Sequence, residues 1–353
     1  MIAAASASAP GKVNLVLQVG QPDHSGYHQL FSVFDSVARR EAVTITLSAP
    51  ARSGNDHATA QAQTAAALAQ AAQAQAQAVS GRPWWEEVEV TTTVQIDPAT
   101  DKETEQELAH LDPAQHLAVR ALKEVAQNSG SERSQQLQAK QIHARLEVVK
   151  TIPMAGGMAG GSADAAAALV AANAVLQAEL DDEELHRLGR RLGADVPACL
   201  AGEVTVATGY GDQIQRSYRV PTHHWVFVLA HQGLSTPEVF RHFDSLELGR
   251  NELDTELSPS LEQALLGGQV AQLFQNDLQP VAAKRDDLKQ TLQELSARAL
   301  PAIISGSGPT IAVPAADAEA AHALAQEIRT WPTVAATLVT TSPSAPARLE
   351  WEK

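Results

Sequence analysis

Four glycines within six residues carry the strongest chemical signal in the chain. They are Gly156, Gly157, Gly160 and Gly161. The segment before them, 145–153, is typical of a strand, and the Ala-rich segment after them, 162–180, favours a helix. Glycine lets a ligand approach backbone N–H groups, and a helix N-terminus leaves about four such donors unpaired. The arrangement predicts a phosphate site.

This segment, residues 153–162, is called the glycine loop below. Its members are Pro153, Met154, Ala155, Gly156, Gly157, Met158, Ala159, Gly160, Gly161 and Ser162. The loop lacks the GK[ST] ending of a Walker A motif and the GxGxxG spacing of a dinucleotide-binding turn, so those two folds are disfavoured. Ser162 can cap the helix or offer its hydroxyl to a phosphate or a magnesium ion. A glycine-rich turn without a ligand remains the alternative.

The glycine loop resembles the second motif of the GHMP kinase superfamily. APGKVNLVL (9–17) resembles the first motif, and ISGSGPTIAV (304–313) resembles the third. Further segments resemble the 4-diphosphocytidyl-2-C-methyl-D-erythritol kinases within that superfamily. These matches are PGKVNL (10–15), GYH (26–28), LGADVPACLAG (192–202), STPEVF (235–240) and QNDLQPVA (275–282). Together they span about residues 8–340, apart from an Ala/Gln-rich insertion.

The resemblance implies an ATP-dependent kinase whose catalytic residues are Lys12 and Asp195. A kinase of this kind needs a carboxylate that accepts the proton of the attacking hydroxyl, and Asp195 in GADVP is similar to that residue. Lys12 would offset the charge that develops on the transferred phosphoryl group. Asn14 resembles a neighbouring polar residue that contacts the substrate. It shares a strand face with Lys12, as the two-residue period of a strand requires.

The resemblance also assigns the substrate and the nucleotide. Tyr27 and His28 are similar to residues that hold a cytidine group, and Phe240 to a second stacking ring on the other side of the base. Lys150, just before the glycine loop, is expected to contact the nucleotide. The implied ligands are ATP, Mg²⁺ and a cytidine diphosphate-linked methylerythritol. The sequence does not identify the metal ligands.

Several residues depart from the GGGLGGGSSNAA pattern that this family usually carries. They are Ala155, Met158, Ala159, Ala163 and Asp164. Ala159 carries a Cβ where the pattern has glycine. Asp164 adds a negative charge near the expected phosphates, which puts its direct contact with ATP in doubt. His116 replaces an Asn that is frequent near the adenine pocket.

The succession of strands and helices predicts an α+β protein, because no strict βαβ repeat is present. The resemblance implies a two-domain GHMP kinase fold. Residues 1–218 would form a ribosomal protein S5 domain 2-like ATP-binding domain, and residues 219–353 a ferredoxin-like domain. The low-complexity insertion, 51–82, is predicted to take no part in the chemistry.

Composition and charge argue against nucleic-acid and membrane partners. The chain has 353 residues and a net charge of −15, which disfavours a nucleic-acid partner. A single cysteine, Cys199, excludes an intrachain disulfide and fits a reducing, cytoplasmic compartment. No apolar run approaches the ~18 residues of a membrane helix, so no membrane partner is expected. We expect a monomer or a homodimer.

Two alternatives remain open at this point. The first is another GHMP kinase, of the homoserine or mevalonate type, although such substrates have no base to stack on the expected aromatic residues. The second is a catalytically silent ligand-binding protein on the same fold. Production of ADP with a suitable alcohol separates the second alternative from both kinases.

Overall fold

The computed structural model describes residues 2–49, 85, 88–97, 105, 108, 112–133, 137, 142–154 and 156–353. Its strands are β1 (Ala3–Pro22), β2 (His28–Ser48), β3 (Val88–Val94), β4 (His143–Lys150), β5 (Val204–Thr208), β6 (Gln213–Tyr218), β7 (His223–Leu229), β8 (Gln275–Asn276), β9 (Ile303–Ile304), β10 (Ile311–Ala315), β11 (Ala336–Ser342) and β12 (Arg348–Glu352). Its α-helices are α3 (Leu117–Asn128), α5 (Gly160–Val175), α6 (Asp182–Leu192), α7 (Val196–Ala201), α8 (Thr236–Ser245), α9 (Pro259–Leu266), α10 (Gln279–Ala282), α11 (Asp286–Ala297) and α12 (Ala318–Ile328). Short 3₁₀ turns are η2 (Pro113–Gln115) and η3 (Val270–Leu273). The predicted insertion, 51–82, and Ala155 lie outside the described residues.

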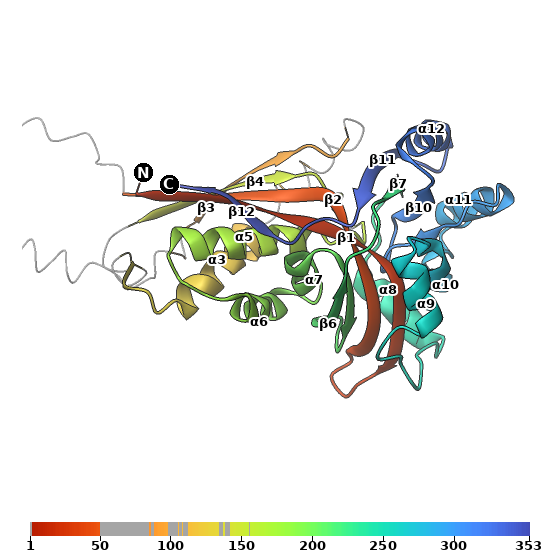
Figure 1. Cartoon of the computed structure of the whole chain (residues 1–353), viewed down its shortest axis with the longest axis horizontal. Coiled ribbons are helices and arrows are strands. Elements are labelled where there is room, and N and C mark those ends of the chain that lie inside the picture. The colour runs from red at the N-terminus through yellow and green to blue at the C-terminus, as the bar shows by residue number, and fades with distance from the viewer. Residues whose placement is uncertain are drawn as a thin grey trace, which may run out of the picture.

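Two sheets organise the described residues (Figure 1). The larger has the order β12-β1-β2-β4-β3, with β5 paired to β2, β6 to β5 and β8 to β1. The smaller has the order β11-β7-β10-β9, and all its pairs are antiparallel. This mixture confirms the α+β class. Because β8 and β12 come from the second predicted half and pair with β1, the first sheet contains strands from both halves, and the boundary at 218/219 stays a prediction.

The long β1–β2 hairpin connects the two ends of the larger sheet. One end of β2, at 42–48, pairs with β4, and the other end, at 32–35, pairs with β5. The β1–β2 register shifts between Pro10 and Gly11. A Cβ at Gly11 would lie 2.8 Å from the carbonyl oxygen of Met158, so glycine is needed for β1 to approach the glycine loop this closely. The hairpin thereby brings the first motif against the second.

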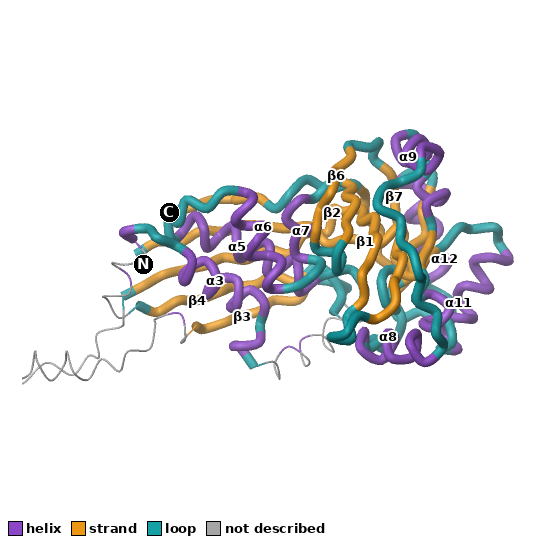
Figure 2. Tube along the Cα trace, turned by 90° about the horizontal axis from the view of Figure 1, so that it is seen from below, coloured by secondary structure: helices purple, strands orange, loops and turns teal. Residues whose placement is uncertain are grey.

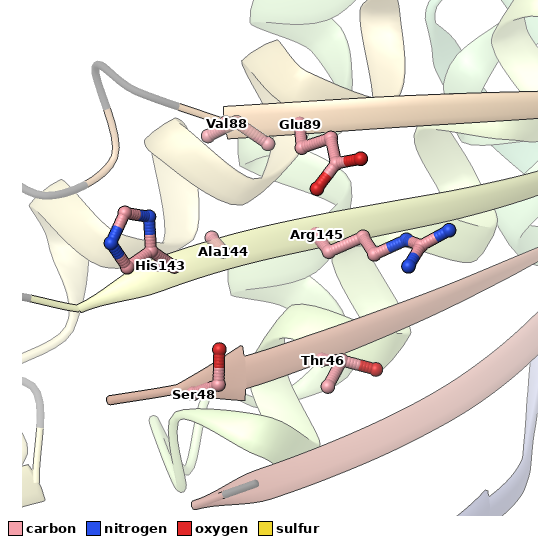
Figure 3. A pocket seen from close by; sticks show the side chains of 7 residues that line it. All are labelled: Thr46, Ser48, Val88, Glu89, His143, Ala144 and Arg145. Carbon is pink, nitrogen blue, oxygen red and sulfur yellow. The ribbon is translucent and has the colours of Figure 1, made fainter. Parts of the chain in front are cut away.

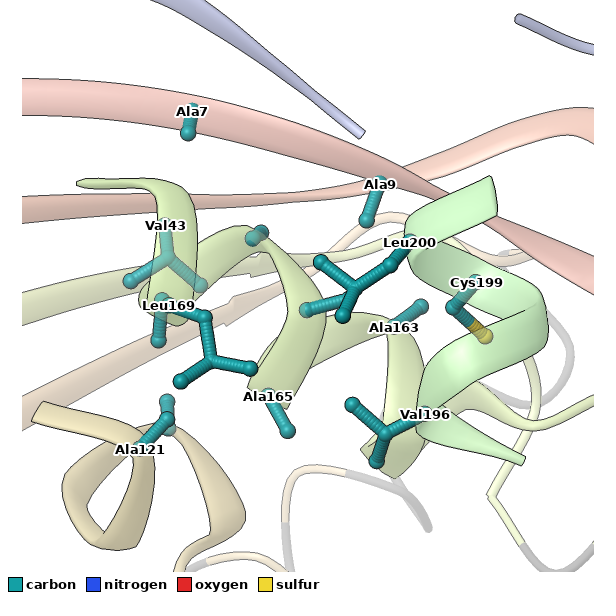
Figure 4. Packing of buried hydrophobic residues seen from close by; sticks show 14 of the residues in the cluster. Ala7, Ala9, Val43, Ala121, Ala163, Ala165, Leu169, Val196, Cys199 and Leu200 are labelled. Atoms are coloured by element: carbon teal, nitrogen blue, oxygen red, sulfur yellow. The ribbon is translucent and has the colours of Figure 1, made fainter. Parts of the chain in front are cut away.

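Helix α5 lies at the centre of the helical layer that covers one face of the larger sheet (Figure 2). Most of its alanines are completely buried: Ala163, Ala165, Ala166, Ala167, Ala168, Ala171 and Ala172. Figure 4 shows Ala163, Ala165 and Leu169 packed among side chains of β1, β2, α3 and α7. Small side chains let the helix axis approach the sheet, and this close packing fixes the height of the helix N-terminus above β1. No helix in the described part of the chain is long and apolar enough to cross a membrane.

A buried group of charged residues ties α5 to the strands before the glycine loop. The ammonium of Lys150 lies 2.8 Å from Oε1 of Glu41 and 2.7 Å from Oδ2 of Asp164. Glu41 also accepts hydrogen bonds from the N–H groups of Thr151 (2.8 Å) and Ile152 (3.3 Å). The glycine loop therefore departs from a point where β2, β4 and α5 are held together.

The charges of this group are strongly coupled. Burial, together with the charge of Asp164, raises the pKa of Glu41 to about 8. Burial lowers the pKa of Lys150, but the charges of Asp164 and Glu41 outweigh burial and raise it above its usual value. Lys150 is thus a permanent cation between two carboxyl groups that have little access to water.

A second buried pair joins the two sheets. The carboxylate of Asp35, on β2, accepts hydrogen bonds from Nε2 of His223 (2.7 Å) and Nε1 of Trp225 (3.2 Å), both on β7. Nδ1 of His223 lies 3.0 Å from the carbonyl oxygen of Pro221, so both ring nitrogens face acceptors. Burial lowers the pKa of His223, but the hydrogen bond and the charge of Asp35 outweigh burial and raise it.

The His223–Asp35 pair predicts a pH-dependent stability. A histidine in the unfolded chain has a pKa of about 6.5, and the folded protein raises the pKa of His223 above that value. The pair therefore stabilises the fold fully below pH ~6.5, and this stabilisation is lost as the pH rises through the pKa of His223 in the folded protein. We expect His223→Gln to lower the free energy of unfolding by about 2 kcal/mol at pH 6, and by less at pH 9. Urea denaturation of both proteins measures the difference. His224→Gln, one residue along the strand, is the control. A loss in the free energy of unfolding of His223→Gln that grows with pH would contradict the prediction.

Loss of Lys150 should be far more costly than loss of an exposed cation on the same strand. Lys150→Met leaves the carboxyl groups of Glu41 and Asp164 buried without a counter-charge, and we expect a loss of about 3–5 kcal/mol in the free energy of unfolding. Arg145→Met removes an exposed partner of Glu147 and should cost less than about 1 kcal/mol. Equal losses in the two variants, measured by urea denaturation, would refute the role of Lys150.

Candidate active site

Lys12 lies where the three sequence motifs meet. Its ammonium donates to Oδ1 of Asn14 at 2.7 Å and to the carbonyl oxygen of Gly157 at 3.1 Å. Oδ2 of Asp195 lies 3.4 Å from the same nitrogen. Lys12 is only 4% exposed, and the ring of Phe34 covers it at 5.4 Å. The structure thus brings together Lys12, Asn14 and Asp195, which the sequence predicted as one site.

The third motif closes over this group from the other side. The hydroxyl of Ser305 donates to the carbonyl oxygen of Gly157 at 2.8 Å, and the N–H of Thr310 donates to that of Gly156 at 3.3 Å. A Cβ at Gly306 would lie 3.6 Å from the ammonium of Lys12. At Gly157, φ is +76° and a Cβ would lie 2.1 Å from the carbonyl oxygen of Ser305, so only glycine fits this contact.

Asp195 precedes helix α7 and keeps its carboxylate available. The residue occupies the N-cap position, but its side chain accepts no capping hydrogen bond. The side chain is 36% exposed, in contrast to its partner Lys12. A Cβ at Gly193, in the same turn, would lie 4.0 Å from Oγ of Ser162, which places this turn beside the start of α5. The carboxylate is therefore held by Lys12 and open to a ligand.

The glycine loop leads into α5 earlier than the sequence indicated. The helix begins at Gly160, so Ser162 lies inside the first turn and is not the cap. The N-cap is Ala159, which takes a left-handed conformation (φ 61°, ψ 33°) and supplies no side-chain hydrogen bond. The first N–H groups of this sixteen-residue helix have no partner within the helix and no capping side chain, which suits an anion. Met158 buries its side chain, and its carbonyl oxygen accepts the N–H of Lys12 at 3.1 Å.

Lys150 differs from the sequence expectation, and the structure also gives Asp164 and His116 definite partners. Lys150, expected at the nucleotide, is 2% exposed, and its ammonium is enclosed by Glu41 and Asp164, so it supports the loop from behind instead of facing a ligand. Asp164 likewise binds Lys150, in agreement with the doubt about a direct contact with ATP. Nδ1 of His116 accepts the N–H of Ala118 at 3.2 Å, so His116 caps α3.

The aromatic residues gather at the end of the β1–β2 hairpin. The rings of His28 and Phe240 lie 5.0 Å apart, at 42°. Nε2 of His28 lies 2.7 Å from Oδ1 of Asp244, so helix α8 supplies both an aromatic and a polar partner for the imidazole. Tyr27, the neighbour of His28, is 67% exposed. The three residues predicted to hold a base therefore lie around the junction of β2 and α8.

Some residues that shape the site were not assigned a role from sequence. Nδ2 of Asn276 donates to the carbonyl oxygens of Ile304 and Gly306, both at 2.7 Å, and so fixes the third motif. Oγ1 of Thr236 lies 2.7 Å from Oγ of Ser307, which joins α8 to the same turn. Asn276 and Thr236 belong to the matched segments QNDLQPVA and STPEVF. Their partners are distant in sequence, so the sequence alone gave no reason to assign these contacts.

A polar hollow of about 540 Å³ lies apart from these motifs (Figure 3). Its lining is Thr46, Ser48, Val88, Glu89, His143, Ala144 and Arg145, on β2, β3 and β4. Val43, Ile45 and Leu47 alternate with Thr46 and Ser48 along β2 and are buried, so the hollow opens on the face of the sheet opposite to α5. No metal-binding group of three or more His, Cys, Asp or Glu side chains occurs among the described residues.

Comparisons with known proteins agree with this geometry. The family model for the GHMP kinases N terminal domain matches residues 116–203. A 4-diphosphocytidyl-2-C-methyl-D-erythritol kinase of Pseudarthrobacter chlorophenolicus is 35% identical over 329 residues, which cover 91% of this chain and 88% of that protein. The protein of the same name from Cutibacterium acnes is 34% identical and covers 96% and 94%.

Solved structures show the same fold. A crystal structure of 4-(cytidine 5'-diphospho)-2C-methyl-D-erythritol kinase superposes with a TM-score of 0.63 at 24% identity, covering 96% of this chain and all of that one. Mevalonate kinase of L. major in complex with R-mevalonate gives a TM-score of 0.63 at 14% identity, with 96% of each chain covered. With about a third of its residues identical to those of relatives that it matches over most of their length, this chain belongs to the 4-diphosphocytidyl-2-C-methyl-D-erythritol kinase family of the GHMP kinases.

Proposed function

We propose that this protein uses ATP to phosphorylate the C2 hydroxyl of 4-diphosphocytidyl-2-C-methyl-D-erythritol. The products are the 2-phosphate and ADP, and the reaction belongs to the non-mevalonate route to isoprenoid precursors. One observation carries the proposal. The buried ammonium of Lys12 lies both 3.1 Å from the carbonyl oxygen of Gly157, in the glycine loop, and 3.4 Å from Oδ2 of Asp195. A phosphate held at the loop and an alcohol held at Asp195 would therefore be neighbours. A cytoplasmic location is part of the proposal.

In the proposed reaction, Asp195 acts as the base. Its partly exposed carboxylate accepts the proton of the C2 hydroxyl while the oxygen of that hydroxyl forms a bond to the γ-phosphorus. The bond from the γ-phosphorus to the bridging oxygen breaks, and the electron pair leaves with ADP. Lys12 keeps Asp195 oriented and offsets negative charge on the transferred group. Asn14 holds the ammonium of Lys12 in place at 2.7 Å.

The start of α5 is the proposed seat of the triphosphate. The free N–H groups of the first helical turn and the positive end of the helix dipole would bind phosphate oxygens. Mg²⁺ in such enzymes is held mainly by phosphates and waters, with few protein oxygens. The hydroxyl oxygen of Ser162, which lies beside the turn that contains Gly193 and Asp195, could serve as such a protein ligand for Mg²⁺. Mg²⁺ bound there would neutralise phosphate charge.

The cytidine group is proposed to lie among Tyr27, His28 and Phe240. The exposed ring of Tyr27 and the half-buried ring of Phe240 offer flat surfaces for the base. The contact between Oδ1 of Asp244 and Nε2 of His28 fixes the orientation of the imidazole beside them. This aromatic group favours a nucleotide-linked alcohol over homoserine or mevalonate, which have no base.

Asp195→Asn tests the proposed chemistry. The amide cannot accept the proton, so we expect kcat to fall at least ~100-fold while the Kd for ATP changes little. Asp182→Asn, the same substitution at an exposed position on α6, should leave kcat unchanged. Turnover near that of the wild type in the Asp195 variant, measured by coupled ADP release, would remove Asp195 from the mechanism.

A substrate panel tests the proposed specificity. We expect ADP release with 4-diphosphocytidyl-2-C-methyl-D-erythritol and little or none with homoserine or mevalonate, because only the first places a base on the aromatic residues. The same coupled assay, with all three alcohols at equal concentration, measures this. Preferred turnover of homoserine or mevalonate would assign the chain to a different activity, and no ADP with any alcohol would favour a silent ligand-binding protein.

A further inference from the structure

The tip of the β1–β2 hairpin is braced by a second hairpin that no sequence motif identifies. β2 pairs with β5, and the N–H of Leu30 donates to the carbonyl oxygen of Gly209 at 2.7 Å. This pairing places the β5–β6 turn, which contains Tyr210, beside the segment from Asp23 to Tyr27. Gly209 and Gly211, both with positive φ, flank Tyr210 and shape that turn.

Asp23 forms hydrogen bonds with both the N–H and the carbonyl oxygen of Tyr27. The N–H of Asp23 donates to the carbonyl oxygen of Tyr27 at 2.7 Å, and the N–H of Tyr27 donates to Oδ1 of Asp23 at 3.1 Å. The N–H and hydroxyl of Ser25 donate to the same carboxylate oxygen at 2.8 and 2.5 Å. The hydroxyl of Ser25 and then that of Tyr210 hold the pKa of Asp23 well below its usual range, so Asp23 is an acceptor at any working pH.

Tyr210 holds the other oxygen of Asp23. Its hydroxyl donates to Oδ2 at 2.8 Å, and its ring lies 6.0 Å from the ring of Tyr27 at 72°, an edge-to-face arrangement. Tyr27 thus has its backbone fixed by Asp23 and its ring contacted by Tyr210. Tyr27 is nevertheless 67% exposed, so a large part of its ring surface is open to a ligand.

We infer that Asp23, Tyr27 and Tyr210 form a tyrosine clamp in which Tyr210 is a positioning residue for the base-binding ring of Tyr27. The inference rests on the proposed function, because it takes the cytosine ring as the occupant of the Tyr27 surface. An exposed aromatic side chain without such a brace loses rotamer freedom when a ligand binds, and that loss weakens binding. The clamp removes part of that cost before the ligand arrives. Tyr210 acts through its contacts with Asp23 and Tyr27 and is assigned no part in the chemical step.

Tyr210→Phe tests the clamp, because it retains the ring and removes only the hydroxyl bonded to Asp23. We expect the Kd for CDP, measured by calorimetry, and the KM for the cytidine substrate to rise about five-fold. The kcat and the KM for ATP should stay within two-fold of the wild type. Tyr218→Phe removes a hydroxyl from the end of the same hairpin and is the matched control, with CDP affinity unchanged.

A double-mutant cycle separates positioning from direct binding. In a Tyr27→Ala background, Tyr210→Phe should have no further effect on the Kd for CDP, because the ring that it positions is absent. An equal effect in both backgrounds, or no effect of Tyr210→Phe on the wild type, overturns the clamp. A wild-type protein that fails to bind CDP contradicts the proposed function and the clamp together. Wild-type binding with an unaffected Tyr210→Phe variant contradicts the clamp alone.

Discussion

The buried ammonium of Lys12 is the interaction on which the site depends. A cation in a protein interior must be surrounded by acceptors, because the loss of hydration is otherwise too costly. Here each acceptor comes from a different segment: Asn14 from β1, the carbonyl oxygen of Gly157 from the glycine loop, and the carboxylate of Asp195 from the turn before α7. The need to satisfy one charge therefore holds three segments at fixed separations. Glycine is needed at Gly11 and Gly157 because the main chains of β1, the glycine loop and the third motif approach each other closely beside Lys12.

A second buried lysine, Lys150, has a purely structural environment. Lys150 is enclosed by two carboxyl groups, those of Glu41 and Asp164, in the layer behind the glycine loop. Its partner Asp164 is as buried as the lysine itself, whereas the partner of Lys12, Asp195, is about one-third exposed. The difference lies in the partner's access to solvent: the Lys12–Asp195 pair is open to solvent, whereas the Lys150 pair is enclosed and joins β2, β4 and α5. The glycine loop lies between these two cations, one structural and one facing the proposed reaction.

Patterns of short range were predictable from the sequence, and contacts of long range were not. The alternation of Lys12 and Asn14, the glycine loop and the Ala-rich α5 follow from local periodicity and composition, and the structure has them. The enclosure of Lys150 was not foreseen, because Glu41 lies 109 positions earlier in the chain. The left-handed conformation of Ala159 could not be predicted from the sequence either, because alanine adopts it only where surrounding contacts stabilise it. The strand β12 carried no motif, and its pairing depends on β1 at the opposite end of the chain.

That pairing has a consequence for synthesis. Residues Ala5 to Ser8 of β1 are hydrogen-bonded on one side to β2 and on the other to residues 348–352. During translation, β2 is available early, but the outer edge of β1 stays without its partner until residues 348–352 have left the ribosome. An open edge strand can pair with other chains, so the nascent protein carries an aggregation-prone surface until residues 348–352 are made. Among the described strands of the larger sheet, this pairing joins the residues farthest apart in sequence, and such non-local contacts form slowly.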